Sequence, residues 1–393
     1  MIAFTFPGQG SQRPGMGEAW VDHASWELVD EASAVAGRDL GRLLLEADAD
    51  ELRQTRNAQL TTFVLSLVVL DAVERLGVAP AAAAGHSLGE YTALTATGAF
   101  SFADGVRVVT ARGEAMQDAA EDNPGTMAAV LGLDDDDADA ACRRADGDVW
   151  VANFNAPGQI VIAGSAAAVA DAAVVAKELG AKKVMPLPVG GAFHTPFMAP
   201  ARDDLRKAIA EATLRAPDVP VVANVDARPN LDPDDWATLL SAQLVSPVRW
   251  RHTVQRLADD GTTTLVELGP GSVLTGMAKR IVPGLTYTSV ATPDDLDRLL
   301  EVLAGAPAAR RAELDGEHLF AHERMIVSPA AGLFALDPRW APDAPGRLEV
   351  GDLLGTIGEV EVRSLFAGAL MGLLAVDGER VTASQPIAWL RTP

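Results

Sequence analysis

The segment Gly85-His86-Ser87-Leu88-Gly89-Glu90 marks a sharp turn between a strand and a helix. It follows the apolar run 78–84 and precedes a segment of helical character at 91–98. In such a turn the small flanking residues leave room for the backbone, and the serine hydroxyl points out of the sheet. The motif predicts strand–helix connections and makes Ser87 a candidate nucleophile, with an ordinary structural turn as the alternative.

Strands and helices alternate on both sides of this turn. The sequence predicts strands at 2–6, 219–223 and 264–267, and helices at 57–76 and 102–120. Such alternation predicts an α/β fold, with a mostly parallel sheet covered by helices on both faces.

The pattern of predicted strands and helices changes between residues 126 and 190. Apolar runs predict strands at 127–131, 159–163 and 183–187, separated by helices at 134–145 and 166–179. This β-α-β-α-β order predicts a small subdomain at 126–190, inserted into a core made of 1–125 and 191–305.

The helical pattern ends near residue 305. From about 323 to 390 the sequence is strand-and-turn, with the dipeptides Ser-Pro, Pro-Gly, Gly-Asp and Asp-Gly at short spacing. That spacing predicts a small all-β domain at 322–393, with a boundary between 305 and 322.

Charge and cysteine content exclude several classes of protein. The chain carries 32 Lys and Arg against 54 Asp and Glu, a formal net charge of −22. An acidic chain of this kind argues against binding to nucleic acid or to an anionic membrane surface, because both need a basic face. Cys142 is the single cysteine, the N-terminus lacks a basic signal-peptide region, and no cluster has metal-ligand spacing. We therefore expect a cytoplasmic protein without metal or membrane span.

A serine nucleophile needs a base, and the chain has six histidines. His194 lies in the loop 190–196 between a predicted strand and a helix, where a scaffold displays functional groups. The alternative is a histidine at a helix N-terminus with a structural role. His86 is a rival base, but adjacent side chains on a tight turn diverge.

Arg112 lies on an otherwise apolar helix and is expected to be partly buried. A buried guanidinium needs a carboxylate, which it can bind through two hydrogen bonds. The partner is either an internal Asp or Glu or the carboxylate of a substrate, and the residues alone leave both open.

Separated motifs over residues 1 to 305 resemble, in order and spacing, those of the malonyl-CoA:acyl carrier protein transacylases. They are Pro7-Gly8-Gln9-Gly10-Ser11-Gln12, Gln59, Gly85-His86-Ser87-Leu88-Gly89-Glu90, Arg112-Gly113, Asn153-Phe154-Asn155-Ala156-Pro157-Gly158-Gln159, Ala192-Phe193-His194, Asn224-Val225-Asp226, Gln243-Leu244, Pro247-Val248-Arg249-Trp250 and Glu267-Leu268-Gly269-Pro270-Gly271. The resemblance implies an α/β-hydrolase-like large subdomain with a ferredoxin-like insert at 126–190.

The resemblance also implies catalytic roles. Ser87 is the nucleophile and His194 the base, and the backbone carbonyl of Gln243 orients the imidazole. The backbone N–H groups of Gln9 and Leu88 form the oxyanion hole.

Three further residues are implied to bind substrate. Arg112 holds the free carboxylate of the malonyl group, Gln59 lines the acyl pocket, and Asn155 helps to position the substrate. No cofactor is needed for this chemistry.

The implied activity is transfer of a malonyl group from malonyl-CoA to the phosphopantetheine thiol of an acyl carrier protein. It runs by ping-pong chemistry through a malonyl-serine, in fatty-acid or polyketide biosynthesis. Two alternatives remain: a hydrolase of acyl thioesters that uses Ser87 and His194, and an acyl-binding or scaffold subunit of a larger synthase or decarboxylase assembly. Arg112 distinguishes the transferase from these alternatives, because a guanidinium that binds the free carboxylate selects malonyl over acetyl.

The tail resembles a biotinyl/lipoyl domain, with segments 327–332 and 348–354 in its first half and 362–368, 376–381 and 385–387 in its second. The modified lysine belongs on the hairpin at 357–360, yet no lysine lies beyond Lys279. We therefore expect a degenerate barrel-sandwich domain that carries neither biotin nor lipoate and serves packing or docking.

Overall fold

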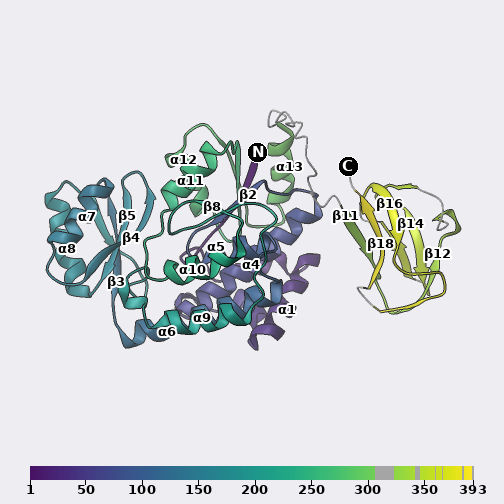
Figure 1. Ribbon diagram of the computed structural model, residues 1–393, viewed down its shortest axis with the longest axis horizontal. Helices are drawn as coiled ribbons and strands as arrows, with labels where there is room; N and C mark the ends of the chain where they lie inside the picture. The colour runs from purple at the N-terminus through teal and green to yellow at the C-terminus, as the bar shows by residue number, and fades with distance from the viewer. Residues whose placement is uncertain (306–322, 341–345, 359, 365, 383–384, 392–393) are drawn as a thin grey trace. The chain divides into compact units, whose positions relative to one another are not determined.

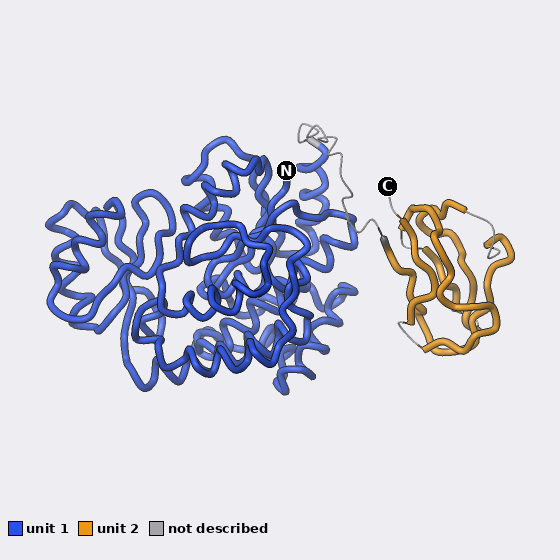
Figure 2. The backbone as a smooth tube through the Cα atoms, viewed as in Figure 1, with its two compact units in different colours: residues 1–309 blue, residues 310–393 orange. Residues whose placement is uncertain are grey.

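The computed structural model describes residues 1–305, 323–340, 346–358, 360–364, 366–382 and 385–391. The chain separates into two units, residues 1–309 and 310–393 (Figure 2). The domain boundary predicted between 305 and 322 falls on residues 306–322, outside the described residues.

A six-stranded sheet forms the centre of the N-terminal unit (Figure 1). Its order is β10-β9-β1-β2-β7-β8, and every neighbouring pair is parallel except β7 and β8. The strands are β1 (Ile2–Phe6), β2 (Ala82–Gly85), β7 (Val221–Val222), β8 (Pro229–Asn230), β9 (Thr264–Leu268) and β10 (Thr286–Val290). The predicted mostly parallel sheet is confirmed, although the strand expected at 219–223 is shorter.

Both faces of this sheet are buried, as parallel sheets require. Phe4, Phe6 and Val266 pack into one core, together with α4 (Thr55–Arg75), α5 (Leu88–Ala96) and α6 (Phe102–Asp122). Ala3 and Leu265 point the other way, into a core shared with α11 (Trp250–Asp259) and α12 (Val273–Ile281). The remaining helices of this unit outside the inserted subdomain are α1 (Glu27–Ala36), α2 (Leu40–Leu45), α3 (Ala49–Arg53), α9 (Ala201–Glu211), α10 (Pro233–Gln243) and α13 (Asp295–Gly305), with short 3₁₀ turns at Glu18–Trp20, Ala24–Trp26 and Pro196–Met198.

Helix α4 is the one described helix that is long and apolar enough to cross a membrane. Within it, 89% of the most apolar window is buried inside the unit. Its apolar character is therefore explained by its place in the core, between α5, α6 and the sheet.

A second sheet forms the inserted subdomain. Its strands β3 (Thr126–Leu131), β4 (Val149–Ala156), β5 (Gln159–Gly164) and β6 (Lys183–Pro186) pair antiparallel in the order β4-β5-β3-β6. Helices α7 (Asp135–Arg144) and α8 (Ala166–Glu178) pack together against it. The predicted β-α-β-α-β order was wrong in one respect, because it lacked β4. Polar Asn153 and Asn155 interrupt the apolar alternation of that strand.

Strand β4 also ties the insert to the main core. The backbone N–H of Phe154 donates to the carbonyl of Val248, and the N–H of Val248 donates to Ala152. The side chains of β4 near its end are therefore held beside the main sheet.

The C-terminal unit is built from β-strands, as expected. Two four-stranded antiparallel sheets have the orders β11-β18-β16-β13 and β15-β14-β12-β17. Buried Phe334, Leu348, Leu354 and Leu390 fill the core between them. The strands are β11 (Glu323–Val327), β12 (Gly332–Leu336), β13 (Arg347–Leu348), β14 (Leu353–Ile357), β15 (Val360–Arg363), β16 (Gly368–Leu373), β17 (Arg380–Val381) and β18 (Pro386–Arg391), with a 3₁₀ turn at Pro338–Trp340.

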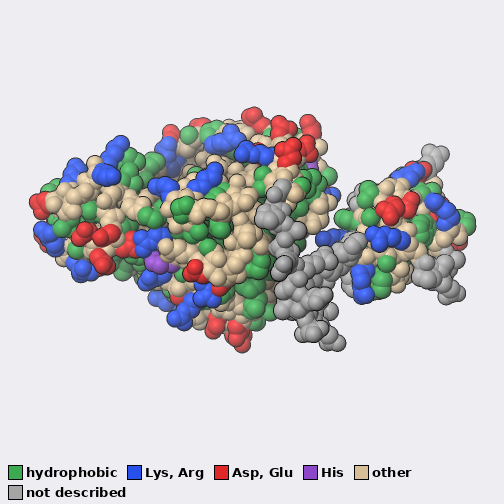
Figure 3. Space-filling view, turned by 90° about the horizontal axis from the view of Figure 1, so that it is seen from above, with side chains coloured by type: hydrophobic (Ala, Val, Ile, Leu, Met, Phe, Trp, Pro, Cys, Tyr) green, Lys and Arg blue, Asp and Glu red, His purple; other side chains and the backbone are tan. Residues whose placement is uncertain are grey.

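Acidic and basic side chains are interspersed on the surface of the N-terminal unit that Figure 3 shows. The net charge of −22 is therefore not gathered into one acidic field on this face.

Candidate active site

Ser87 sits in the turn between β2 and α5, with backbone angles φ 52° and ψ −105°. A non-glycine residue adopts such a conformation only when its surroundings force it. A side-chain carbon on Gly85 would lie 1.9 Å from the Gly89 backbone, and one on Gly89 would lie 2.0 Å from the carbonyl oxygen of Phe6. Both positions therefore require glycine, and the two glycines allow the turn that lifts Ser87 above the sheet.

His194 faces this serine from the loop that follows β6. Its Nε2 lies 2.8 Å from Ser87 Oγ, and its Nδ1 lies 2.9 Å from the carbonyl oxygen of Gln243. Because a carbonyl only accepts, Nδ1 carries the proton and Nε2 is left to accept the serine proton. Burial, followed by the positive charge of Arg112, lowers the pKa of His194 to about 3. The imidazole is therefore a neutral base at ordinary pH.

Arg112 on α6 reaches the same hydroxyl. Its side chain is 1% exposed, and Nη2 donates to Ser87 Oγ at 3.2 Å and to Gln243 Oε1 at 3.0 Å. Nη1 donates to Gln59 Oε1 at 2.6 Å, while Nε is buried without a hydrogen-bond partner. Among the described residues no carboxylate forms an ion pair with this guanidinium. A buried cation whose direct hydrogen-bond partners are all neutral is placed to receive an anionic group.

Gln59 and Asn155 occupy different positions relative to the serine. Gln59 on α4 is 1% exposed and binds Arg112 directly. Asn155 on β4 does not contact Ser87. Its Oδ1 lies 2.8 Å from Nε2 of His86, whose ring packs edge-on against Trp250.

The predicted oxyanion donors lie at the same end of the sheet as Ser87. Gln9 follows β1, and β1 pairs in parallel with β2, so that Phe6 lies opposite Gly85. A side-chain carbon on Gly8 would lie 2.4 Å from the His86 carbonyl, which shows how closely this loop approaches the serine turn. In the described chain neither Gln9 nor Leu88 uses its backbone N–H in a hydrogen bond. Both donors remain available to a ligand.

Four contacts were not foreseen from the sequence. The Gln243 side chain joins the site as well as its carbonyl, since Nε2 donates to the Ser87 carbonyl at 2.9 Å and also to Glu90 Oε2. Asn224 accepts from the Ser87 N–H at 2.7 Å and donates to the Gly85 carbonyl at 2.7 Å. Both Glu90 and Asn224 lie within the recognised motifs, but nothing in the sequence shows that these segments touch.

The site contains no arrangement suited to a metal. Among the described residues, no group of three or more His, Cys, Asp or Glu side chains could hold a metal ion. Cys142 is buried away from the site, and burial raises the pKa of its thiol to about 12.

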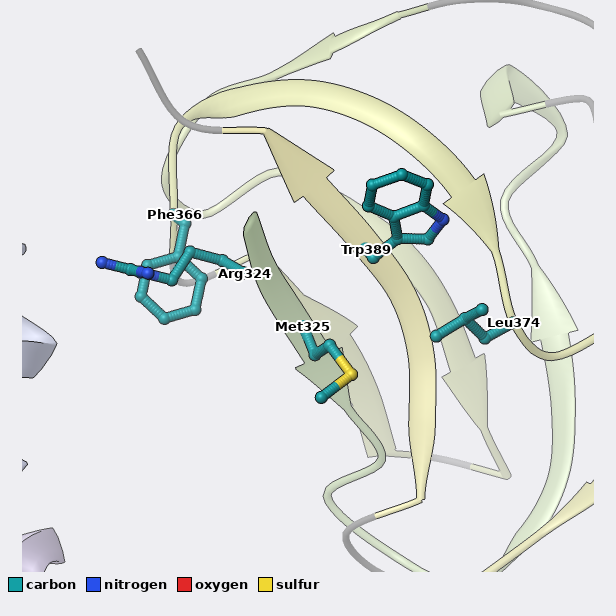
Figure 4. Close-up of a pocket in the computed structure, with 5 residues that line it drawn as sticks. All are labelled: Arg324, Met325, Phe366, Leu374 and Trp389. Carbon is teal, nitrogen blue, oxygen red and sulfur yellow. The ribbon is translucent and has the colours of Figure 1, made fainter. Parts of the chain in front are cut away.

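A separate hollow of about 450 Å³ lies in the C-terminal unit (Figure 4). It is lined by Arg324, Met325, Phe366, Leu374 and Trp389, and Met325 and Trp389 pair across β11 and β18. The hollow contains none of the predicted site residues.

Comparison with known proteins identifies close relatives of the N-terminal unit. The family model described as "Acyl transferase domain" matches residues 3–292. The malonyl CoA-acyl carrier protein transacylase of Escherichia coli (strain K12) is 43% identical over 308 residues, which cover 77% of this chain and 99% of that protein.

Solved structures agree with this match. An acyl-carrier-protein S-malonyltransferase from Burkholderia pseudomallei 1710b has a TM-score of 0.74 and 45% identity, covering 76% of this chain and 99% of that one. A malonyl-transacylase solved in complex with its type II polyketide acyl-carrier protein has a TM-score of 0.74 and 38% identity, with coverage of 76% and 99%.

Proposed function

Because the chain belongs to the acyl transferase family, we propose that it transfers a malonyl group from malonyl-CoA to the phosphopantetheine thiol of an acyl carrier protein. It is an acyltransferase enzyme, of the kind that serves fatty-acid or polyketide biosynthesis. The observation that carries the proposal is that Ser87 Oγ lies within hydrogen-bond distance of both His194 and Arg112.

In the first half-reaction, Ser87 Oγ attacks the thioester carbonyl while His194 Nε2 takes its proton. A C–O bond forms, the C–S bond breaks, and the imidazolium returns the proton to the leaving coenzyme A thiolate. The negative charge on the carbonyl oxygen is received by the backbone N–H groups of Gln9 and Leu88. The Gln243 carbonyl supports the imidazolium through Nδ1, where a hydrolase would use an aspartate.

In the second half-reaction, the thiol of the carrier protein replaces coenzyme A. His194 takes the thiol proton, the sulfur attacks the malonyl ester, and the Ser87 oxygen leaves with the proton that His194 returns. Both steps use groups of the chain itself, so the proposed chemistry requires no metal and no resident cofactor.

Arg112 supplies the selectivity. The free carboxylate of a malonyl group satisfies the buried guanidinium, whereas acetyl leaves its charge without a counter-ion. Gln59 fixes one side of that guanidinium and lines the acyl pocket. Asn155 acts one contact further out, by holding the His86 ring beside the serine turn.

The finer features of the fold belong to the same proposal. We assign the core as α/β-hydrolase-like, because a nucleophile between a parallel strand and a helix is typical of that fold. The β-α-β-β-α-β order of the insert supports a ferredoxin-like subdomain.

The paired sheets of the C-terminal unit support a biotinyl/lipoyl-like domain, with the β14–β15 hairpin in the position of the modified residue. The tail holds no lysine, so we propose that it carries no biotin or lipoate and serves packing or docking. A single buried cysteine favours a cytoplasmic protein.

The test is covalent loading. The full chain is mixed with malonyl-CoA and read by intact mass and peptide mapping, then mixed with a holo acyl carrier protein. We expect a malonyl adduct on Ser87 that the carrier discharges and that Ser87→Ala lacks. Release of free malonate without transfer would favour a hydrolase. The absence of any adduct would favour a binding subunit.

A further inference from the structure

Glu90 is a fully buried carboxyl group one turn beyond the nucleophile, on α5. It is 0% exposed, and its Oε1 accepts from the backbone N–H of Asn224 at 2.6 Å, while Oε2 accepts from Gln243 Nε2. No step of the proposed reaction uses it. A buried carboxyl group is costly, so its presence beside the site needs an explanation.

The Gln243 amide links this carboxyl group to Arg112, the residue proposed to bind the malonyl carboxylate. Its oxygen accepts from Arg112 Nη2 at 3.0 Å and its nitrogen donates to Glu90. The amide dipole therefore points its negative end at the cation and its positive end at the carboxyl group. When Glu90 is ionised, Glu90 and Arg112 are opposite charges that the Gln243 amide bridges without direct contact between them.

We propose that Glu90 is a positioning residue that sets how tightly Arg112 holds the carboxylate of the incoming acyl group. As a carboxylate, Glu90 offsets the charge of Arg112 through the Gln243 amide and competes with the substrate for it. As a neutral acid, formed by taking one proton from solvent, it leaves that charge to the substrate. This inference rests on the proposed function, because it concerns the malonyl carboxylate.

Among the described titratable side chains near Arg112, Glu90 is the one that changes its protonation state in weakly alkaline solution. Burial raises its pKa to about 8, against the positive charge of Arg112. The other charged or titratable groups that act on it are Asp226 and Tyr91, and His86 and His194 belong to the adjoining serine site. Burial lowers the pKa values of both histidines and raises the pKa of Tyr91 to about 12, so all three stay neutral. Asp226 is exposed and provides a matched control.

The first experiment measures selectivity against pH. Loading of Ser87 by malonyl-CoA and by acetyl-CoA is followed from pH 6.5 to 9.5, and the ratio of the two kcat/KM values is compared. Steps that both substrates share, including the state of His194, cancel in the ratio. We expect the ratio to fall roughly 10-fold as pH rises through about 8, because an added unit charge near Arg112 weakens its hold on the malonyl carboxylate.

Two variants show whether Glu90 causes the pH dependence of the selectivity ratio. In Glu90→Gln, which cannot ionise, the ratio should not change with pH, whereas Asp226→Asn should keep the wild-type dependence. A ratio independent of pH in the wild-type enzyme overturns the proposal, and so does a dependence that disappears in Asp226→Asn. If Glu90 had a purely structural role, Glu90→Gln would lower the kcat/KM values for malonyl-CoA and acetyl-CoA together. The ratio of the two would then equal the wild-type ratio at every pH.

A second measurement does not depend on the folding of Glu90→Gln. Malonyl-CoA and acetyl-CoA are bound to the Ser87→Ala chain at pH 8.5 by calorimetry in two buffers of different ionisation enthalpy. Only malonyl-CoA should cause proton uptake, and equal uptake for both ligands overturns the proposal. If no malonyl adduct forms on wild-type Ser87 at all, the proposed function fails instead, so the two failures are distinguishable.

Discussion

Ser87 and His194 share an unusual backbone conformation. Among the described residues, only Ser87, His194 and Ala227 combine a side chain with a positive φ, at 52°, 61° and 57°. Two of these three residues face one another across a 2.8 Å contact. Strain of this kind persists where the surrounding structure imposes a geometry that function requires. The backbone thus points independently to the pair that the motifs predict.

Removal of the Arg112 side chain should change selectivity more than folding. We expect Arg112→Ala to lower kcat/KM for malonyl loading by roughly 100-fold or more, because it removes a buried partner of a carboxylate. Loading by acetyl-CoA should fall much less. The measurement is Ser87 loading with each substrate by intact mass.

The matched control lies on the same helix. Arg107 is exposed and pairs with Asp104, so Arg107→Ala should leave both rates unchanged. Equal losses for malonyl and acetyl in Arg112→Ala would show that the guanidinium does not bind the substrate carboxylate.

The low pKa of His194 predicts an unusual acid limb. Burial shifts this pKa down to about 3 from the ordinary 6.5, so the base stays unprotonated as pH falls. Loading by malonyl-CoA should therefore keep its kcat/KM between pH 7.5 and about 5, while circular dichroism reports that the fold is intact. A half-maximal point near pH 6.5 in folded protein would contradict the assigned environment of His194.

At the scale of elements, β1 and α6 begin where the sequence predicts, because a short apolar run and a long amphipathic pattern mark them clearly. Strand β4 is missed, since its asparagines break the alternation and it depends on pairing with β5 and Val248. The hydrogen-bond network of Glu90, Asn224 and Gln243 could not be predicted from the sequence, for a related reason. Asn224 and Gln243 both lie more than 130 residues beyond Glu90 along the chain, and only the folded sheet brings them to it.

The serine turn also makes a prediction about packing. In Gly89→Ala the added carbon would meet the Phe6 carbonyl at 2.0 Å, so we expect a loss of about 3 kcal/mol or more in the free energy of unfolding. Gly276 on α12 is the control, because an added carbon there meets nothing within 4 Å. Gly276→Ala should stabilise the unit by about 0.5–1 kcal/mol. Chemical denaturation measures both, and a mild Gly89→Ala would show that the turn can relax.

At the scale of the whole molecule, the two units have independent cores. Every predicted site residue lies in residues 1–309, whose sheets are filled by their own hydrophobic clusters. The C-terminal unit has a separate core between its two sheets. The family match likewise ends at residue 292. The packing therefore indicates that the N-terminal unit, which holds the candidate active site, can be separated from the C-terminal unit.

Deletion of the C-terminal unit tests this separation. A chain of residues 1–309 should fold and load malonyl on Ser87 with a kcat/KM within about twofold of the full chain, because it loses no site residue and no core contact of its own sheets. Loss of loading in a folded 1–309 chain would show that the tail completes the site. The second half-reaction separates two roles for the tail. A fall confined to transfer onto the carrier protein would assign docking to residues 310–393, because loading by malonyl-CoA does not involve the carrier.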